Sequence, residues 1–204
     1  MALLSAGVVS TGLRAALPRS DPPPGLEQEP MLTGHLLLAA PGISDPRFWH
    51  TAILMVRHDR TGALGIVVNR PLGTRPLAIL LEPIGDEAQN ARGTVRIFAG
   101  GPVQPEVGFI VHSAEYEHHG TTPITAELAV TTNLDVLRDI ARGKGPRKAL
   151  IALGYAGWGA GQLETELARD DWVVGPADPD LVFDTPRERV WSEAMARRVR
   201  EVRP

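Results

Sequence analysis

Cysteine is absent from the 204-residue chain, and this absence excludes a whole group of chemistries. Without a thiol there can be no disulfide, no thiolate nucleophile, no redox-active cysteine pair and no Cys-ligated zinc or iron–sulfur site. A reducing compartment suits such a composition, and we expect the protein to be cytoplasmic.

Long apolar runs and a large net charge are also missing. No stretch approaches the roughly 20 apolar residues that span a bilayer, so we expect no membrane partner. The 21 basic and 24 acidic residues give a net charge of −3. The chain therefore lacks the overall basic character of most duplex DNA-binding proteins, although a local basic patch remains compatible with this balance.

The first part of the chain differs in composition from the rest. It has no Lys or Arg ahead of its apolar start, its first basic residue being Arg14, so it does not match a secretory signal. Pro22, Pro23 and Pro24 predict an extended, solvated linker. We expect residues 1–31 to form a disordered N-terminal extension and residues 32–204 to form one globular domain.

Apolar periodicity and turn residues predict an α+β fold for that domain, because strands occur in runs as well as between helices. The segment 51–69 reads as an antiparallel hairpin, with Asp59 and Gly62 at its loop. Strands are predicted at 35–41, 51–59, 62–69, 94–103, 106–113, 127–132, 148–158 and 180–184. Helices are predicted from Pro76 to Pro83, from an Asn133 cap to Gly143, over 161–172, and from Pro186 onward with Val190, Ala194 and Val199 facing the core.

The glycine-rich stretch "GYAGWGAGQLETEL" (154–167) is the most conspicuous local pattern. Its glycines fit no register of a dinucleotide fingerprint, and Ala160 stands where a P-loop needs Lys. Glu164 and Glu166 would also repel a phosphate at the start of the following helix. We interpret the stretch as a sharp turn from a buried strand into a helix, with Tyr155 and Trp158 offering a surface for a small ligand or partner.

Four blocks of the sequence together resemble the YqgE/AlgH family of bacterial proteins. In chain order they are "LTGHLLLAAPGISDPRFWHTAILMVRHDRTGALGIVVNRP", "GGPVQPEVGFIVH", "TTNLDVL" and "GYAGWGAGQLETEL". The resemblance implies one α+β domain with a bifurcated, largely antiparallel sheet, partly closed into a small barrel and surrounded by helices. It also implies a cytosolic protein of unsettled biochemistry, described in some members as a transcriptional regulator, with no agreed catalytic residues.

Histidines supply the candidates for an enzymatic alternative. His58 and His112 end predicted strands and titrate near neutral pH, so they could serve with Glu164 as acid–base groups. No nucleophile stands at a diagnostic spacing, and no G-x-S-x-G elbow surrounds Ser113. Adjacent His118 and His119 point to opposite faces of an extended chain, so they do not suit one metal ion.

Two basic clusters supply the candidates for direct DNA binding. They consist of Arg142, Lys144, Arg147 and Lys148 after one predicted helix, and of Arg197, Arg198, Arg200 and Arg203 in the last one. No pair of helices is joined by a short glycine turn, so no helix-turn-helix is predicted. Direct DNA binding, as a transcriptional regulator, is therefore the second hypothesis for the function of the protein.

The favoured hypothesis is a non-enzymatic binding or regulatory protein that acts through a protein partner or a small ligand. We expect no catalytic residues, no metal and no cofactor. The family-pattern residues chosen as binding candidates are Asn69, Gly101, His112, Tyr155, Trp158, Gln162 and Glu164.

Overall fold

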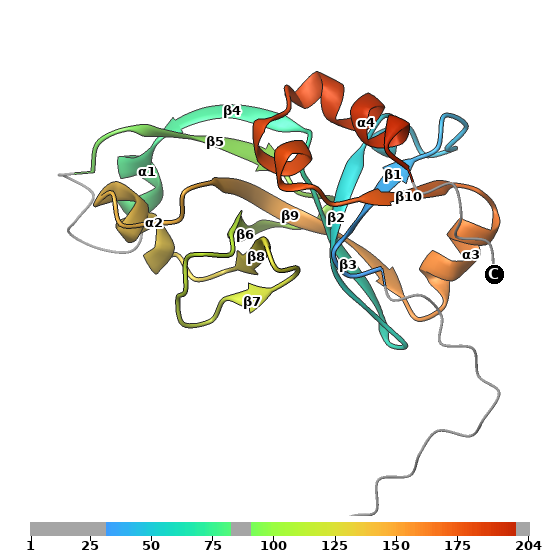
Figure 1. The fold of residues 1–204 in the computed structure, drawn as a ribbon, viewed down its shortest axis with the longest axis horizontal. Helices are drawn as coiled ribbons and strands as arrows, with labels where there is room; N and C mark the ends of the chain where they lie inside the picture. The colour runs from blue at the N-terminus through green and yellow to red at the C-terminus, as the bar shows by residue number, and fades with distance from the viewer. Residues whose placement is uncertain (1–31, 83–90, 199–204) are drawn as a thin grey trace, which may run out of the picture. The chain divides into compact units, whose positions relative to one another are not determined.

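The computed structural model describes residues 32–82 and 91–198 of the chain (Figure 1). The predicted extension 1–31, the expected helix stop at Pro83 and the core position assigned to Val199 lie outside these ranges. The strands are β1 (His35–Ala39), β2 (Ala52–Asp59), β3 (Gly62–Val67), β4 (Pro71–Pro76), β5 (Thr94–Ala99), β6 (Val103–Ser113), β7 (Thr122–Pro123), β8 (Leu128–Thr131), β9 (Ala149–Gly159) and β10 (Trp172–Pro176). The helices are α1 (Leu77–Leu81), α2 (Asp135–Ala141), α3 (Gln162–Ala168) and α4 (Arg187–Ala196), with a 3-10 turn η1 (Pro46–Phe48) and a π-helical turn η4 (Asp180–Asp184).

These strands form one curled, largely antiparallel sheet in the order β10-β1-β2-β3-β9-β6-β8-β7. Strand β9 is the branch point. Its first half pairs with β6 on one side and, in parallel, with β5 on the other, whereas its last residues pair with β3. The β4–β5 ribbon thus leaves the main sheet at β9, and the sheet curls into a half-barrel with helices around it (Figure 1). The predicted α+β class and bifurcated, partly closed sheet are confirmed.

Both faces of the sheet are covered around β1 and β2. Leu36 and Leu38 pack into one core cluster with α4 and η4, while Leu37 packs into a second cluster with Ile53 and Trp172. Burial on both faces explains why these strands are apolar without alternation. A third cluster, which includes Leu77 and Leu137, joins α1 and α2 to the sheet.

The predicted 51–69 hairpin is present, with Asp59 paired to Gly62 across its loop. Helix α2 begins at Asp135, and the Asn133 side chain accepts a hydrogen bond of 2.9 Å from the Asp135 N–H. The cap was therefore located to within one residue. Gly143, the predicted stop, has a φ of +69° just after the helix.

Two predictions of local structure are wrong. The segment 180–184, predicted as a strand, forms η4, in which the Thr185 N–H donates to the Asp180 carbonyl at 2.8 Å. Five residues are too few for periodicity to separate a strand from a helical turn. The helix predicted over 161–172 ends at Ala168, and residue 172 begins β10; Asp170, with a φ of +57°, lies in the break between them.

The glycine stretch turns a buried strand into a helix, as predicted. Strand β9 runs through most of it to Gly159, within one residue of the predicted end, residues 160–161 form the turn, and α3 begins at Gln162. A glycine from another part of the chain approaches this strand closely: Gly101, between β5 and β6, has a φ of +155°, and a Cβ there would overlap the carbonyl group of Tyr155. This contact fixes the start of β6 against β9.

Candidate binding cleft

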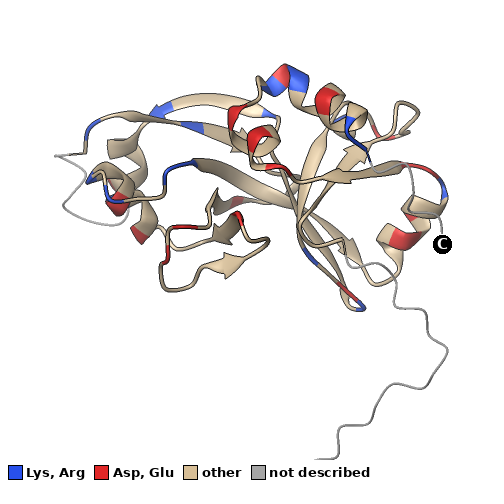
Figure 2. Ribbon diagram, in the orientation of Figure 1, with Lys and Arg blue, Asp and Glu red and all other residues tan. Residues whose placement is uncertain are grey.

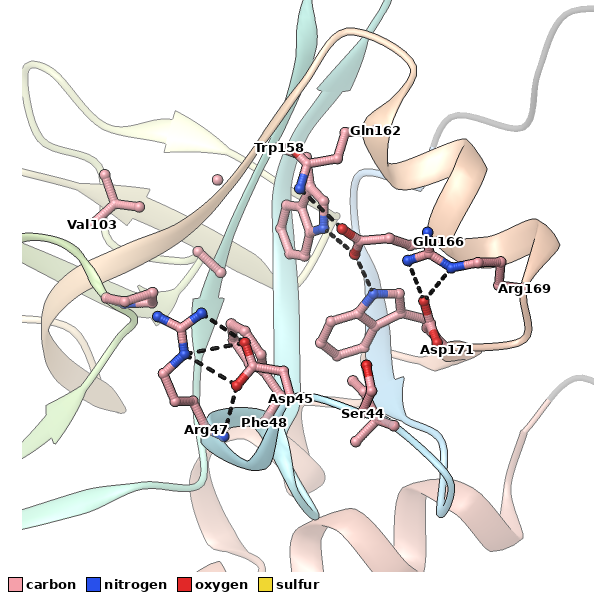
Figure 3. Close-up of a pocket in the computed structure, with 15 residues that line it drawn as sticks. Ser44, Asp45, Arg47, Phe48, Val103, Trp158, Gln162, Glu166, Arg169 and Asp171 are labelled. Carbon is pink, nitrogen blue, oxygen red and sulfur yellow. Dashed lines mark hydrogen bonds and ion pairs between the residues drawn. The ribbon is translucent and has the colours of Figure 1, made fainter.

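The end of β9 and helix α3 are connected by a carboxylate between two indoles. Glu166 Oε2 accepts hydrogen bonds of 2.8 Å from both Trp158 Nε1 and Trp172 Nε1. Its other oxygen accepts a 2.9 Å bond from Gln162 Nε2 (Figure 3). Gln162 Oε1 in turn accepts from the Gly159 N–H. Three donors therefore hold the Glu166 carboxylate, and the chain from Gly159 to α3 is closed into a ring of hydrogen bonds.

Aromatic rings form the wall beside this carboxylate. Trp158 and Trp172 meet edge to face, with centroids 5.9 Å apart, and Phe48 from η1 meets Trp172 edge-on at 5.4 Å. Both indoles are buried against the second core cluster. The wall is consequently rigid, because its rings are fixed by core packing as well as by Glu166.

Two ion pairs lie at the rim. Arg47 reaches Asp45 at 2.6 Å, and Arg169 reaches Asp171 at 2.6 Å (Figure 3). The side-chain hydrogen bonds from Arg47 lower the pKa of Asp45, and the Arg47 backbone N–H lowers it further. Each rim cation therefore has its own anion two residues away in the sequence.

The floor of the cleft is an open strand edge. Gly62 of β3 lies directly against the Trp158 carbonyl oxygen, so the backbone polar groups of Trp158 face β3. Successive residues of an antiparallel strand direct these groups to opposite sides. The N–H and C=O of Gly157 therefore point away from β3. The Gly159 N–H, two residues on, points away from β3 to Gln162, in agreement with this alternation. Gly157 is exposed, and β6 pairs with β9 no further along than Tyr155.

These parts enclose a cavity of about 270 Å³, which we call the tryptophan cleft. It is lined by Ile43, Ser44, Asp45, Arg47, Phe48, Pro102, Val103, Ala156, Gly157, Trp158, Gln162, Glu166, Arg169, Asp171 and Trp172. Two of the seven candidate residues, Trp158 and Gln162, line it, and Gly101 and Tyr155 flank it.

The other three candidate residues lie elsewhere and serve the fold. Asn69 accepts from the Ala52 N–H and donates to the His50 carbonyl. His112 is fully buried on β6, with its Nδ1 3.0 Å from the Ser113 carbonyl. Glu164, on the other side of α3 from the cleft, contacts His58.

The His58–Glu164 pair has both imidazole nitrogens engaged. Nδ1 accepts the Leu32 N–H at 3.2 Å, which leaves the proton on Nε2, and Nε2 lies 2.7 Å from Glu164 Oε1. His58 is 5 % exposed. The pair joins the beginning of the domain to α3, and His58 lines neither the tryptophan cleft nor any part of its wall.

Sequence reasoning missed the roles of Glu166, Trp172 and the two rim ion pairs. The spacing of Gln162 and Glu166, one helical turn apart, was a signal for a shared contact. Their indole partners come from separate strands, so only the fold brings them together.

Several side chains of the two basic clusters are paired with acids. Arg147 contacts Glu115 at 3.4 Å, Lys148 forms an ion pair with Asp184, and Arg197 reaches Asp178 at 3.0 Å. Figure 2 shows red and blue segments interspersed along the ribbon. Arg200 and Arg203 lie outside the described ranges.

Within the parts of the chain that the structure describes, no helix is long and apolar enough to cross a membrane. In the same ranges, no three His, Asp or Glu side chains gather where they could hold a metal ion.

Comparison with known proteins decides the family. A model of the AlgH-like family matches residues 36–202. The chain belongs to the AlgH-like family. The predicted resemblance to YqgE/AlgH proteins is thereby confirmed.

Relatives within the AlgH-like family are similar over most of their length. A UPF0301 protein from Rhodospirillum rubrum is 43 % identical over 171 residues, which are 84 % of this chain and 89 % of the relative. A UPF0301 protein from Pseudomonas aeruginosa is 44 % identical over 167 residues, 81 % of this chain and 88 % of the relative.

Two solved structures share the AlgH-like fold. The solution structure of the AlgH protein from Pseudomonas aeruginosa has a TM-score of 0.68 and 42 % identity, covering 84 % of this chain and 92 % of that one. The crystal structure of a protein from Corynebacterium diphtheriae has a TM-score of 0.67 at 22 % identity, covering 86 % and 91 %, and so supports the fold alone. The names of these relatives specify no activity.

Proposed function

We propose that this AlgH-like protein is a non-enzymatic binding or regulatory protein, and that the tryptophan cleft receives a protein partner or a small ligand. The observation that carries the proposal is the open edge of β9 at Gly157, exposed in the floor of the cleft. An exposed N–H and C=O at a strand edge bind amide-like groups, including an extended peptide segment that adds to the sheet.

The walls of the cleft suit such a ligand. Trp158, Trp172 and Phe48 provide apolar surface next to the open edge, and Val103 lies opposite Trp158 (Figure 3). Binding sites of small molecules combine this kind of apolar lining with a few fixed polar groups. We expect recognition to depend on shape and backbone hydrogen bonds, because the charged groups of the cleft already have partners.

The pairing of those groups also supports a binding role over catalysis. General acid–base chemistry needs a titratable group free to exchange a proton with the substrate. In the cleft, Glu166 already accepts three hydrogen bonds and Asp45 and Asp171 hold arginines. Ser44 lines the cleft, but no histidine does so to activate it.

The test is to fill the open edge without disturbing the wall. In Gly157→Leu the new side chain would crowd the open edge, where its Cβ meets the Tyr155 ring at 3.1 Å and the side chain of Val103, which lines the cleft, at 3.9 Å. Ala160→Leu is the matched control, since Ala160 is exposed in the neighbouring turn and does not line the cleft.

The measurement is a screen of seven-residue peptides by fluorescence anisotropy and of mixed metabolites by ligand-observed NMR. We expect a ligand that binds the wild type and Ala160→Leu and loses at least about tenfold in affinity for Gly157→Leu. Ligands that bind all three proteins equally would place the binding site elsewhere.

A further inference from the structure

A second cavity, of about 340 Å³, lies between the β4–β5 ribbon, the start of β9 and the η4–α4 segment. It shares no lining residue with the tryptophan cleft. Its lining consists of Thr74, Thr94, Arg96, Phe98, Ala149, Leu150, Val182, Phe183 and Arg187. We call it the arginine cavity.

Arg187, the first residue of α4, is a buried cation that forms no ion pair with any carboxylate among the described residues. It is 6 % exposed, and its guanidinium donates to the carbonyl oxygens of Val68, Val182 and Thr185. Among the described residues, no Asp or Glu lies within ion-pair distance of it. Buried charges in proteins are normally paired, so this one needs an explanation.

A second cation and two hydroxyls face the same cavity from the ribbon. Thr94, Arg96 and Phe98 alternate along β5 and so share one face, and Thr74 of β4 is the register partner of Arg96. In the described parts of the chain, the Arg96 guanidinium and the two threonine hydroxyls make no hydrogen bond or ion pair. All three residues are exposed, so their donors face solvent at the mouth of the cavity and are open to a ligand.

The nearest acids do not neutralise the cavity. Asp184 is exposed and paired with Lys148, and Glu188 is exposed on α4; neither lines the cavity. Burial lowers the pKa of Arg187 and the nearby charge of Arg96 lowers it further, whereas the charges of Asp184 and Glu188 raise it. Among the described residues, the lining of the cavity itself holds two guanidiniums and no carboxylate.

We propose that the arginine cavity binds the oxyanion group, phosphate or carboxylate, of a small organic molecule. Arg96 and Arg187 bind the oxyanion, since the guanidinium fork matches both groups in geometry. Thr74 and Thr94 add hydroxyl donors. Leu150 and Phe183 contact the apolar body of the ligand.

The test uses inorganic phosphate and acetate as probes of the full chain. Each is titrated by isothermal calorimetry with ionic strength held constant by sodium chloride, so that simple charge screening is the same throughout. We expect saturable one-site binding. In Arg96→Gln the affinity should fall at least about tenfold, because one charge-assisted pair of hydrogen bonds is lost.

Arg75→Gln is the matched control. The substitution removes one positive charge next to Thr74 on β4. The side chain of Arg75 projects from the opposite face of the ribbon and does not line the cavity. We expect its affinity to stay within about twofold of the wild type, a change far below that of a lost charged hydrogen bond.

Saturable binding of phosphate but not of acetate would indicate that the natural ligand is a phosphate ester. Equally strong binding of acetate would indicate a carboxylic acid. Absence of saturable binding for both probes, or equal loss of affinity in Arg96→Gln and Arg75→Gln, overturns the proposal.

Thermal unfolding provides a second measurement, which requires no substitution of the buried Arg187. A ligand that binds only the native state raises its melting temperature. We expect phosphate or acetate to raise it for the wild type, less for Thr94→Val, and least for Arg96→Gln. An equal rise in all three proteins would rule out this cavity as the site.

Discussion

The tryptophan cleft and the arginine cavity differ in how their charges are satisfied. In the cleft, Glu166 is held by three donors and each rim arginine has an aspartate. In the arginine cavity, the Arg187 guanidinium has three carbonyl acceptors and the Phe98 ring, 5.9 Å away, but no ion pair, and Arg96 has no hydrogen-bond or ion-pair partner among the described residues. The difference indicates two kinds of recognition: apolar and backbone contacts in the cleft, and charge in the cavity.

The two regions also differ in how they are built. The cleft is assembled from core residues and a close backbone crossing at Gly101, whereas Arg96 and Thr94 of the cavity lie exposed on a two-stranded ribbon. Substitutions in the cleft should therefore change stability most, and substitutions on the ribbon should change mainly ligand affinity.

Gly101→Ala is expected to have the largest effect. Its Cβ would overlap backbone atoms of Tyr155, which cannot rotate away, at a φ that favours glycine. We expect a loss of at least about 4 kcal/mol in the free energy of unfolding, or failure to fold. Urea denaturation gives the value. Gly108→Ala, on the strand β6 that follows Gly101, is the control, because the nearest atom to its Cβ is 4.0 Å away. Equal losses in the two variants would contradict the crossing as the cause.

Glu166→Ala is expected to have the next largest effect. It leaves the indole N–H groups of Trp158 and Trp172 without their acceptor, for a loss of about 2–3 kcal/mol. Glu166→Gln keeps one acceptor oxygen and should lose about 1 kcal/mol. Urea denaturation followed by tryptophan emission measures both, and an emission unchanged in Glu166→Ala would mean that the carboxylate does not organise the wall.

Local segments of the fold could be predicted from sequence where the pattern is self-contained. The 51–69 hairpin has two apolar runs with Asp59 and Gly62 between them, and α2 carries its own cap and stop. Strand β10 could not be found this way, since its first residue, Trp172, continues a helical pattern and only pairing with β1 makes it a strand. Strand β4, which was not predicted, begins and ends with proline and pairs only with β5.

The residues of the candidate site could likewise be predicted only where they lie in one continuous sequence pattern. Trp158 and Gln162 were identified because both lie in one glycine-rich block. Glu166 lies in that block too, but its function depends on Trp172 and on contacts across strands. The burial of Arg187 was equally invisible: at the start of a charged helix it reads as exposed, and only the packing of η4 beside it covers it.

Glu115, which lines neither the tryptophan cleft nor the arginine cavity, is a carboxylate that accepts several hydrogen bonds, and its titration tests how such bonds stabilise a charge. Burial raises its pKa, but hydrogen bonds from the Arg147 backbone and Ser113 outweigh this and lower it from 4.5 to about 2. Since its folded pKa lies below the unfolded value, its stabilisation is complete above that value and is lost as the pH falls from 4.5 toward 2. We expect Glu115→Gln to unfold with a weaker pH dependence than wild type in this window, as measured by thermal melts from pH 6 downward. Identical pH profiles would exclude the depressed pKa.

Arg47→Gln is expected to have the smallest effect, and it tests whether the paired rim charges of the tryptophan cleft matter to stability. Arg47 has 69 % of its side chain exposed, so its bond to Asp45 is largely screened by solvent. Asp45 still accepts the backbone N–H of residue 47, so η1 should persist. We expect the free energy of unfolding, measured by urea denaturation, to change by less than about 0.5 kcal/mol, and by less still in high salt.

The affinity of the Arg47→Gln variant for phosphate should also be unchanged, because Arg47 lies outside the arginine cavity. A loss of phosphate affinity in Arg47→Gln equal to that in Arg96→Gln would mean that the two regions do not recognise ligands separately, and the contrast between satisfied and unsatisfied cations would fail.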